Sequence, residues 1–161
     1  MTVTEPAASP LNDQDVFGYF RLGLATGLVD RGAVIAWADR EVLRRPVPQN
    51  EIIELCLSGH LPYSQLIWLL TSYHPSLDYD LPVRLVLARA AQLLDEHHPP
   101  EELLTSIGLL AAEARLPEEI RALLRELDSN LGYLSPPELP GRLGGLLAPY
   151  REYQPLLREI G

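Results

Sequence analysis

The sequence predicts an all-α protein, a single-domain bundle or short array of about 7–9 antiparallel helices, and three observations lead to this class. Leucine, a good helix former, is the commonest apolar residue, while β-branched and aromatic residues are sparse. The segments between chain breaks are short and closely connected, which is typical of antiparallel helices. Prolines, whose preset φ angle suits the first turn of a helix, recur where leucine-rich segments begin, at Pro48, Pro62, Pro82, Pro100, Pro117 and Pro137.

Two amphipathic helices are predicted in the first part of the chain. Asn12 or Asp13 can cap a helix over 13–29, and Asp30 can cap the next one, over 31–44. Glycines within the first helix are expected to allow the close approach of a neighbouring helix. The residues expected to face the core recur at helical spacing: Val16, Phe17, Phe20, Leu24, Leu28, Val34, Trp37, Ala38 and Val42.

A charge-free stretch follows, and it is expected to form the buried centre of a soluble domain. No formal charge falls between Glu54 and Asp78. Gly59 and Pro62 interrupt the stretch, so no segment of it reaches the ~20 residues that a membrane-spanning helix needs.

Two helices are predicted within and before this stretch. The first covers 48–58 and ends at Gly59, which we expect to adopt a left-handed capping conformation. The second covers 62–73 and is apolar almost all round, as expected of a central helix. Trp37 and Trp68 are both assigned to the core.

Three further helices are predicted over 82–97, 100–115 and 117–130. The last two open with Pro-Glu-Glu, and acidic side chains at this position favour the positive end of the helix dipole. The third has the clearest helical pattern of the chain, carried by Leu116, Ile120, Leu123, Leu124, Leu127 and Leu131.

From Tyr133 onward, prolines, glycines and tyrosines become dense. Short helices are predicted over 137–147 and 149–160. We therefore expect three parts: a disordered leader over 1–11, a helical core domain over 12–132, and a Pro/Gly/Tyr-rich C-terminal helical extension over 133–161 packed on the core.

Charge and cysteine content narrow the function. All 13 basic residues are arginine and the net charge is −9, so Schiff-base and P-loop lysine chemistry are excluded. An acidic surface repels phosphate backbones, which disfavours nucleic-acid binding. The single Cys56 cannot form an internal disulfide, and the N-terminal segment lacks the pattern of a signal peptide, so a cytoplasmic location is expected, with no membrane association.

Common nucleophile and metalloprotease motifs are absent, so we expect no catalytic residues and no cofactor. The one candidate metal site consists of Cys56, His60 and His74, which could hold zinc. A buried structural cysteine and surface histidines are the favoured interpretation. The same segment, residues 56–80, also contains Tyr63 and Asp78, and it is the candidate centre of a metal- or small-ligand-binding enzyme.

Two sets of residues are candidates for recognition. The first is a basic patch at the end of the second helix, where the arginines also complement the helix dipole. The second is a group of C-terminal tyrosines, which can serve as interface anchors or pack the extension onto the bundle. The six residues are Arg40, Arg44, Arg45, Tyr133, Tyr150 and Tyr153.

These observations favour a non-catalytic cytoplasmic protein that acts by binding another protein. A homo-oligomer is compatible with the same features. One alternative is an immunity-type protein that neutralises a basic toxin, for which the acidic net charge is the supporting feature. The other is the metal- or small-ligand-binding enzyme centred on residues 56–80.

Overall fold

The computed structural model describes residues 11–73, 79–129 and 138–161, and within these ranges every regular element is a helix. The predicted all-α class is therefore confirmed. In chain order the elements, with 3₁₀ helices marked η, are α1 (Asp13–Thr26), α2 (Arg31–Arg44), α3 (Asn50–Cys56), η1 (Ser58–His60), α4 (Tyr63–Tyr73), α5 (Asp80–Asp95), α6 (Pro100–Glu113), α7 (Glu118–Ser129), α8 (Glu138–Leu147), η2 (Ala148–Tyr153) and α9 (Gln154–Ile160).

Local capping sets the start of the first two helices. The Asn12 side chain accepts a hydrogen bond from the backbone N–H of Asp15 at 2.9 Å, and the Asp15 carboxylate accepts one from the N–H of Asn12. This reciprocal pair satisfies two donors that the helix itself leaves unpaired. Asp30 caps α2 in the same way, through the N–H of Ala33 at 2.9 Å.

Prolines mark the later helix starts to within two residues. Pro100 is the first residue of α6, as predicted. α5 begins at Asp80, two residues before its predicted start, so Pro82 lies in the first turn. Proline is tolerated anywhere in the first turn, because the backbone N–H groups there have no intrahelical partner.

The helix ends follow the predictions less closely. α1 ends before Gly27, whose φ of 77° is left-handed, and the chain then turns back over the helix. A Cβ on Gly23 would lie 2.4 Å from the Val29 side chain, so the close approach comes from this turn and not from a neighbouring helix. The left-handed cap predicted at Gly59 is wrong: this glycine lies within η1, where the chain tightens after α3.

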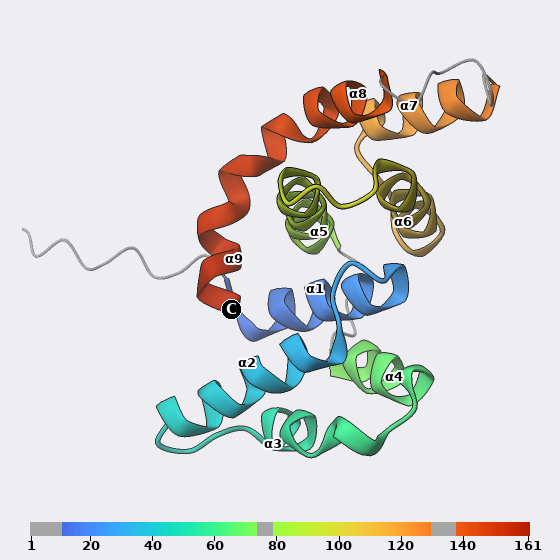
Figure 1. Ribbon diagram of the computed structural model, residues 1–161. Helices are drawn as coiled ribbons and strands as arrows, with labels where there is room; N and C mark the ends of the chain where they lie inside the picture. Colours follow the sequence, from blue (N-terminus) through green and yellow to red (C-terminus); the bar gives the residue numbers. More distant parts are fainter. Residues whose placement is uncertain (1–10, 74–78, 130–137) are drawn as a thin grey trace, which may run out of the picture.

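Two helices form the centre of the molecule, α1 and α5. Helices α4 and α6 pack beside α1, and α6, α8, η2 and α9 pack around α5 (Figure 1). Five consecutive residues of α1, 16–20, and four of α5, 85–88, are buried, which requires neighbours on more than one side of each helix.

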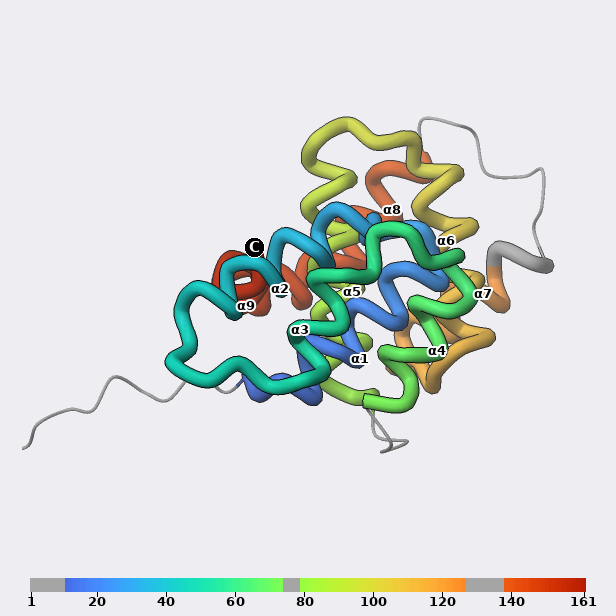
Figure 2. The backbone as a smooth tube through the Cα atoms, turned by 90° about the horizontal axis from the view of Figure 1, so that it is seen from below, coloured from blue at the N-terminus to red at the C-terminus, as the bar shows by residue number. Residues whose placement is uncertain are grey.

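A second layer, made of α2, α3, η1 and α4, lies on the side of α1 away from α5 and is nearest to the viewer in Figure 2. The expectation that the charge-free stretch forms the buried centre is therefore wrong. Only Leu66 and Leu70 of α4 are buried, because α1 covers one side of this helix.

The two tryptophans lie in opposite environments. Trp37 is in the core as predicted, 3% exposed, with its ring edge-on to Phe17 and Phe20. The assignment of Trp68 to the core is wrong, since this side chain is 68% exposed. A helix that carries no charged residue gives little indication of which side its neighbours will cover.

The C-terminal elements α8, η2 and α9 run along α5. Arg84 donates to the Tyr153 hydroxyl at 3.0 Å, and Arg151 pairs with Asp95 at 2.7 Å. Leu139, Leu143, Leu147, Tyr150, Leu157 and Ile160 are buried along this path. Within the described ranges, no helix combines the length and the apolar character needed to cross a membrane.

Candidate functional site

Large apolar side chains that remain exposed gather on the layer of α2, α3 and α4. Of those identified in the described residues, only Leu109 of α6 lies elsewhere. Single exposed apolar residues are ordinary, but several in one layer make that layer a candidate for an interaction surface. We call four of them, on α3 and α4 and the residue that follows α3, the α3–α4 surface: Ile53, Leu57, Tyr63 and Trp68.

Trp68 is the largest member of the α3–α4 surface. At 100° per residue it points away from Leu66 and Leu70, which face α1. Its exposed neighbours one turn away carry no charge: Ser64, Gln65, Thr71 and Ser72. An indole surrounded by uncharged polar groups can be desolvated by a partner without stripping water from an ion.

Arg31 fixes the start of α4 against α2. Its guanidinium lies over the Tyr63 ring, 4.6 Å from the centroid, and its Nη1 donates to the Gly59 carbonyl at 2.8 Å. The Nε atom is buried without a hydrogen-bond partner, so these two contacts are what hold the side chain. Tyr63 is thereby oriented before any partner arrives.

A side-chain contact ties α3 to α4. The Tyr73 hydroxyl donates to the Glu54 carboxylate, and the Tyr73 ring packs on Phe17 with 5.4 Å between ring centroids. Burial, together with the adjacent Glu54, raises the pKa of Tyr73 well above its ordinary value. The hydroxyl therefore keeps its proton at neutral pH and the link persists.

The segment that carries this surface has few charges, and they are negative. Glu51 and Glu54 are the only formally charged residues between 46 and 73. Two arginines from other helices contact the segment: Arg31 is engaged with Tyr63 and Gly59, and Arg21 donates from Nε to the Thr71 hydroxyl at 3.1 Å while its Nη2 pairs with Glu113 at 3.0 Å.

The three arginines predicted to form a basic patch do not act together. Arg44 and Arg45 both pair with the buried Glu41, at 2.5 and 2.9 Å, and Arg45 also binds Asp13 through two hydrogen bonds of 2.7 Å. Arg40 donates to the backbone carbonyl of Ile160. Much of the expected positive charge is thus neutralised within the molecule.

The predicted tyrosine anchors are not presented to a partner where they are described. Tyr150 is buried, and burial raises its pKa. Tyr153 is half-buried and accepts the hydrogen bond from Arg84. Tyr133 lies outside the described residues. Tyr150 and Tyr153 serve to pack the C-terminal elements on α5.

The predicted metal ligands are only partly described. His74, and with it Asp78, lies outside the described residues, while His60 is exposed at the end of η1. In the part of the chain that the structure places, no three His, Cys, Asp or Glu side chains are arranged to hold a metal ion. Burial and the nearby Asp39 carboxylate raise the pKa of the Cys56 thiol to about 11, so it is a poor nucleophile at neutral pH.

No protein-family model, no curated protein and no solved structure matches this chain. Sequence reasoning missed Ile53, Leu57 and Trp68 as a surface. The pattern that could have revealed it is the run of uncharged Ser, Gln and Thr residues around Trp68, since a fully buried helix would not carry so many.

Proposed function

We propose that this protein acts by binding another protein through the α3–α4 surface. The observation that carries the proposal is the 68% exposure of Trp68 on a helix face free of charged residues. Tryptophan is enriched among the few residues that dominate the binding energy of protein interfaces. An indole that stays in water adds no hydrophobic stabilisation to the fold.

The surface is also preorganised, which supports binding. The Tyr73–Glu54 contact joins α3 to α4, and Arg31 holds Tyr63 and Gly59. Side chains and helices that are already in place lose little conformational freedom on association.

The charge pattern favours a partner with a basic rim. Residues 46–73 contribute Glu51 and Glu54 and no basic side chain, on a chain of net charge −9. Opposite charge on the partner would accelerate encounter, while Trp68 would supply the contact energy. An immunity-type protein that neutralises a basic toxin is one case of this arrangement. Its mark would be an association rate that falls steeply as salt is added.

A matched pair of substitutions tests the proposal. Trp68→Gln removes the exposed anchor, and Leu109→Gln makes the same kind of change on α6, away from the layer. We expect wild type and L109Q to retain the same partner polypeptide from native extracts of the source cells, and W68Q to lose it. Recovery by W68Q equal to that by wild type would contradict the proposal, as would the absence of any retained partner.

A further inference from the structure

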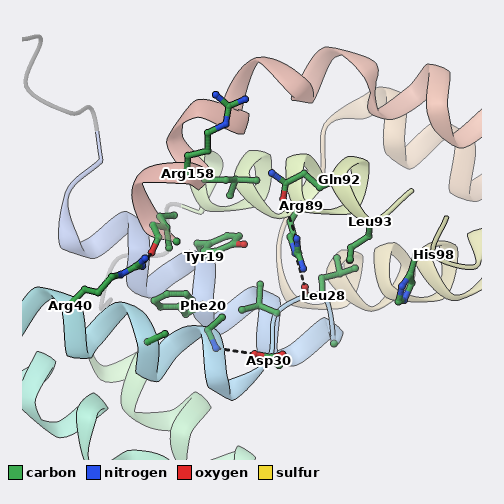
Figure 3. Close-up of a pocket in the computed structure, with 17 residues that line it drawn as sticks. Tyr19, Phe20, Leu28, Asp30, Arg40, Arg89, Gln92, Leu93, His98 and Arg158 are labelled. Carbon is green, nitrogen blue, oxygen red and sulfur yellow. Dashed lines mark hydrogen bonds between the residues drawn. The ribbon is translucent and has the colours of Figure 1, made fainter. Parts of the chain in front are cut away.

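A cavity of about 490 Å³ lies on a different part of the molecule from the α3–α4 surface. Its walls come from α1, the turn between α1 and α2, α2, α5 and α9, with His98 at one edge (Figure 3). The volume falls in the usual range of small-molecule sites.

Three arginines line the cavity, one each from α2, α5 and α9. Of the 13 arginines, eight pair with a carboxylate: Arg21, Arg44, Arg45, Arg84, Arg121, Arg125, Arg142 and Arg151. Among the described residues, the other five have no such partner, and three of these, Arg40, Arg89 and Arg158, line this cavity. The gathering of uncompensated positive charge on an acidic protein points to an anionic ligand.

Arg89 has the most favourable position of the three. It is half-buried, and its contacts are to neutral oxygens: its Nε to the Leu28 carbonyl at 3.4 Å and its Nη1 to the Gln92 side chain at 3.1 Å. A half-buried guanidinium without a counter-ion is costly, and a carboxylate can accept two of its N–H groups at once. In Figure 3 it lies beside Tyr19, while Arg158 extends away from both.

Tyr19 supplies a second donor. The residue lines the cavity, and its side chain is 5% exposed. Burial raises the pKa of Tyr19 to about 12, although Arg89 opposes the rise, so the hydroxyl is protonated at neutral pH and can donate. Asp30, the one acidic side chain among the described lining residues, accepts a hydrogen bond from the N–H of Ala33 and caps α2.

The remaining lining is largely apolar. Phe20, Leu28, Leu93, Leu157 and Ile160 contribute to the walls. Pockets that combine a few fixed polar groups with apolar walls select ligands that have both kinds of surface.

We propose that this cavity binds a small amphiphilic carboxylate, whose head group contacts Arg89 and Tyr19 and whose apolar body lies against α1, α5 and α9. Arg40 and Arg158 add positive potential around the head group. This binding is independent of the α3–α4 surface, and neither proposal requires the other.

Octanoate, 1-octanol and inorganic phosphate are suitable probes, with binding followed by titration of backbone amide NMR shifts. We expect octanoate to saturate shifts at Leu28, Gln92 and Leu93, and 1-octanol and phosphate each to bind at least about tenfold more weakly, a difference of about 1.4 kcal/mol. Phosphate binding as tightly as octanoate would overturn the amphiphilic assignment, and so would no saturable shift with octanoate.

Two variants and a control test the residues. Arg89→Gln should weaken octanoate binding by about tenfold or more, because the substitution removes the charged donor but keeps a polar side chain of similar reach. Arg115→Gln, at another arginine without a carboxylate partner and outside this cavity, should leave the affinity unchanged. If R89Q does not fold, Tyr19→Phe tests the proposal instead. We expect this variant to fold normally and to bind octanoate more weakly. Octanoate affinity unaffected by the folded variants would overturn the proposal.

Discussion

The Tyr73 hydroxyl of α4 donates a hydrogen bond to the Glu54 carboxylate of α3. This contact links the two helices that carry the α3–α4 surface, and the Tyr73 ring anchors the link to Phe17 of the central helix α1. One side chain therefore contacts both α3 and the core.

Tyr73→Phe should destabilise the protein by about 1–2 kcal/mol, because it removes a hydrogen bond to a charged group while keeping the ring. Tyr63→Phe is the matched control, since its ring contact with Arg31 does not depend on the hydroxyl. Urea unfolding of both variants measures the difference. Equal effects of the two substitutions would show that the Glu54 contact contributes nothing.

The two tryptophans should differ sharply in stability and spectroscopy. Trp37→Ala should cost about 3–5 kcal/mol because it empties a core position, whereas Trp68→Gln should change stability by less than about 0.5 kcal/mol. In a Trp37→Phe protein, the remaining Trp68 should be readily quenched by acrylamide. In a Trp68→Phe protein, the buried Trp37 should resist quenching. Similar quenching of both would contradict the placement of Trp68.

The end of α5 stores backbone strain at His97. This residue has a φ of 64°, and the N–H groups of His97 and His98 bond back to Leu94 and Leu93, the pattern of a Schellman cap that usually has glycine at this position. His97→Gly should therefore stabilise the protein by about 1 kcal/mol.

Gly27 provides the reciprocal control for His97. Its φ is 77°, and an added Cβ would meet nothing within 4 Å, so Gly27→Ala tests backbone strain alone. We expect it to destabilise by about 1 kcal/mol. Thermal unfolding should show a higher midpoint for H97G and a lower one for G27A. A lower midpoint for H97G would mean that the His97 side chain contributes more than its strain costs.

Cys56 should react slowly with thiol reagents in the folded protein. With a pKa of about 11 instead of 9.0, about 100-fold less thiolate is present at pH 8. The alkylation rate should rise until about pH 11, and in urea-unfolded protein it should level off near pH 9. Because folding raises this pKa, the thiol's contribution to stability is complete below about pH 9 and is lost as the pH rises towards 11. Equal rates for the folded and unfolded chains would contradict this placement.

The all-α class and most helix starts were predictable because their causes are local. Asn12 and Asp30 bond to N–H groups three residues away, and Pro100 occupies its position by its own geometry. The end of α3 was not predictable in the same way, because Gly59 is held in η1 by Arg31 of α2, a residue far from it in the sequence.

The candidate sites could not be predicted because they depend on tertiary packing. α4 carries no charge and has large apolar residues on more than one side, and the position of α1 decides that Leu66 is buried and Trp68 exposed. The cavity joins Tyr19 to Arg89, which are far apart in the sequence. Its positive character depends on which arginines find carboxylates elsewhere, a result of the whole fold.

Photo-cross-linking in the source cells tests the central claim most directly, which is that Trp68 marks a protein-binding surface. Replacing the exposed Gln65 with p-benzoylphenylalanine places a reactive group one turn from Trp68, and the same replacement at Ala112 of α6, one turn from Leu109, is the control. We expect a discrete cross-linked partner from position 65 that disappears with Trp68→Gln, and none from position 112. No cross-link at position 65, or one that persists in the W68Q background, would contradict the account.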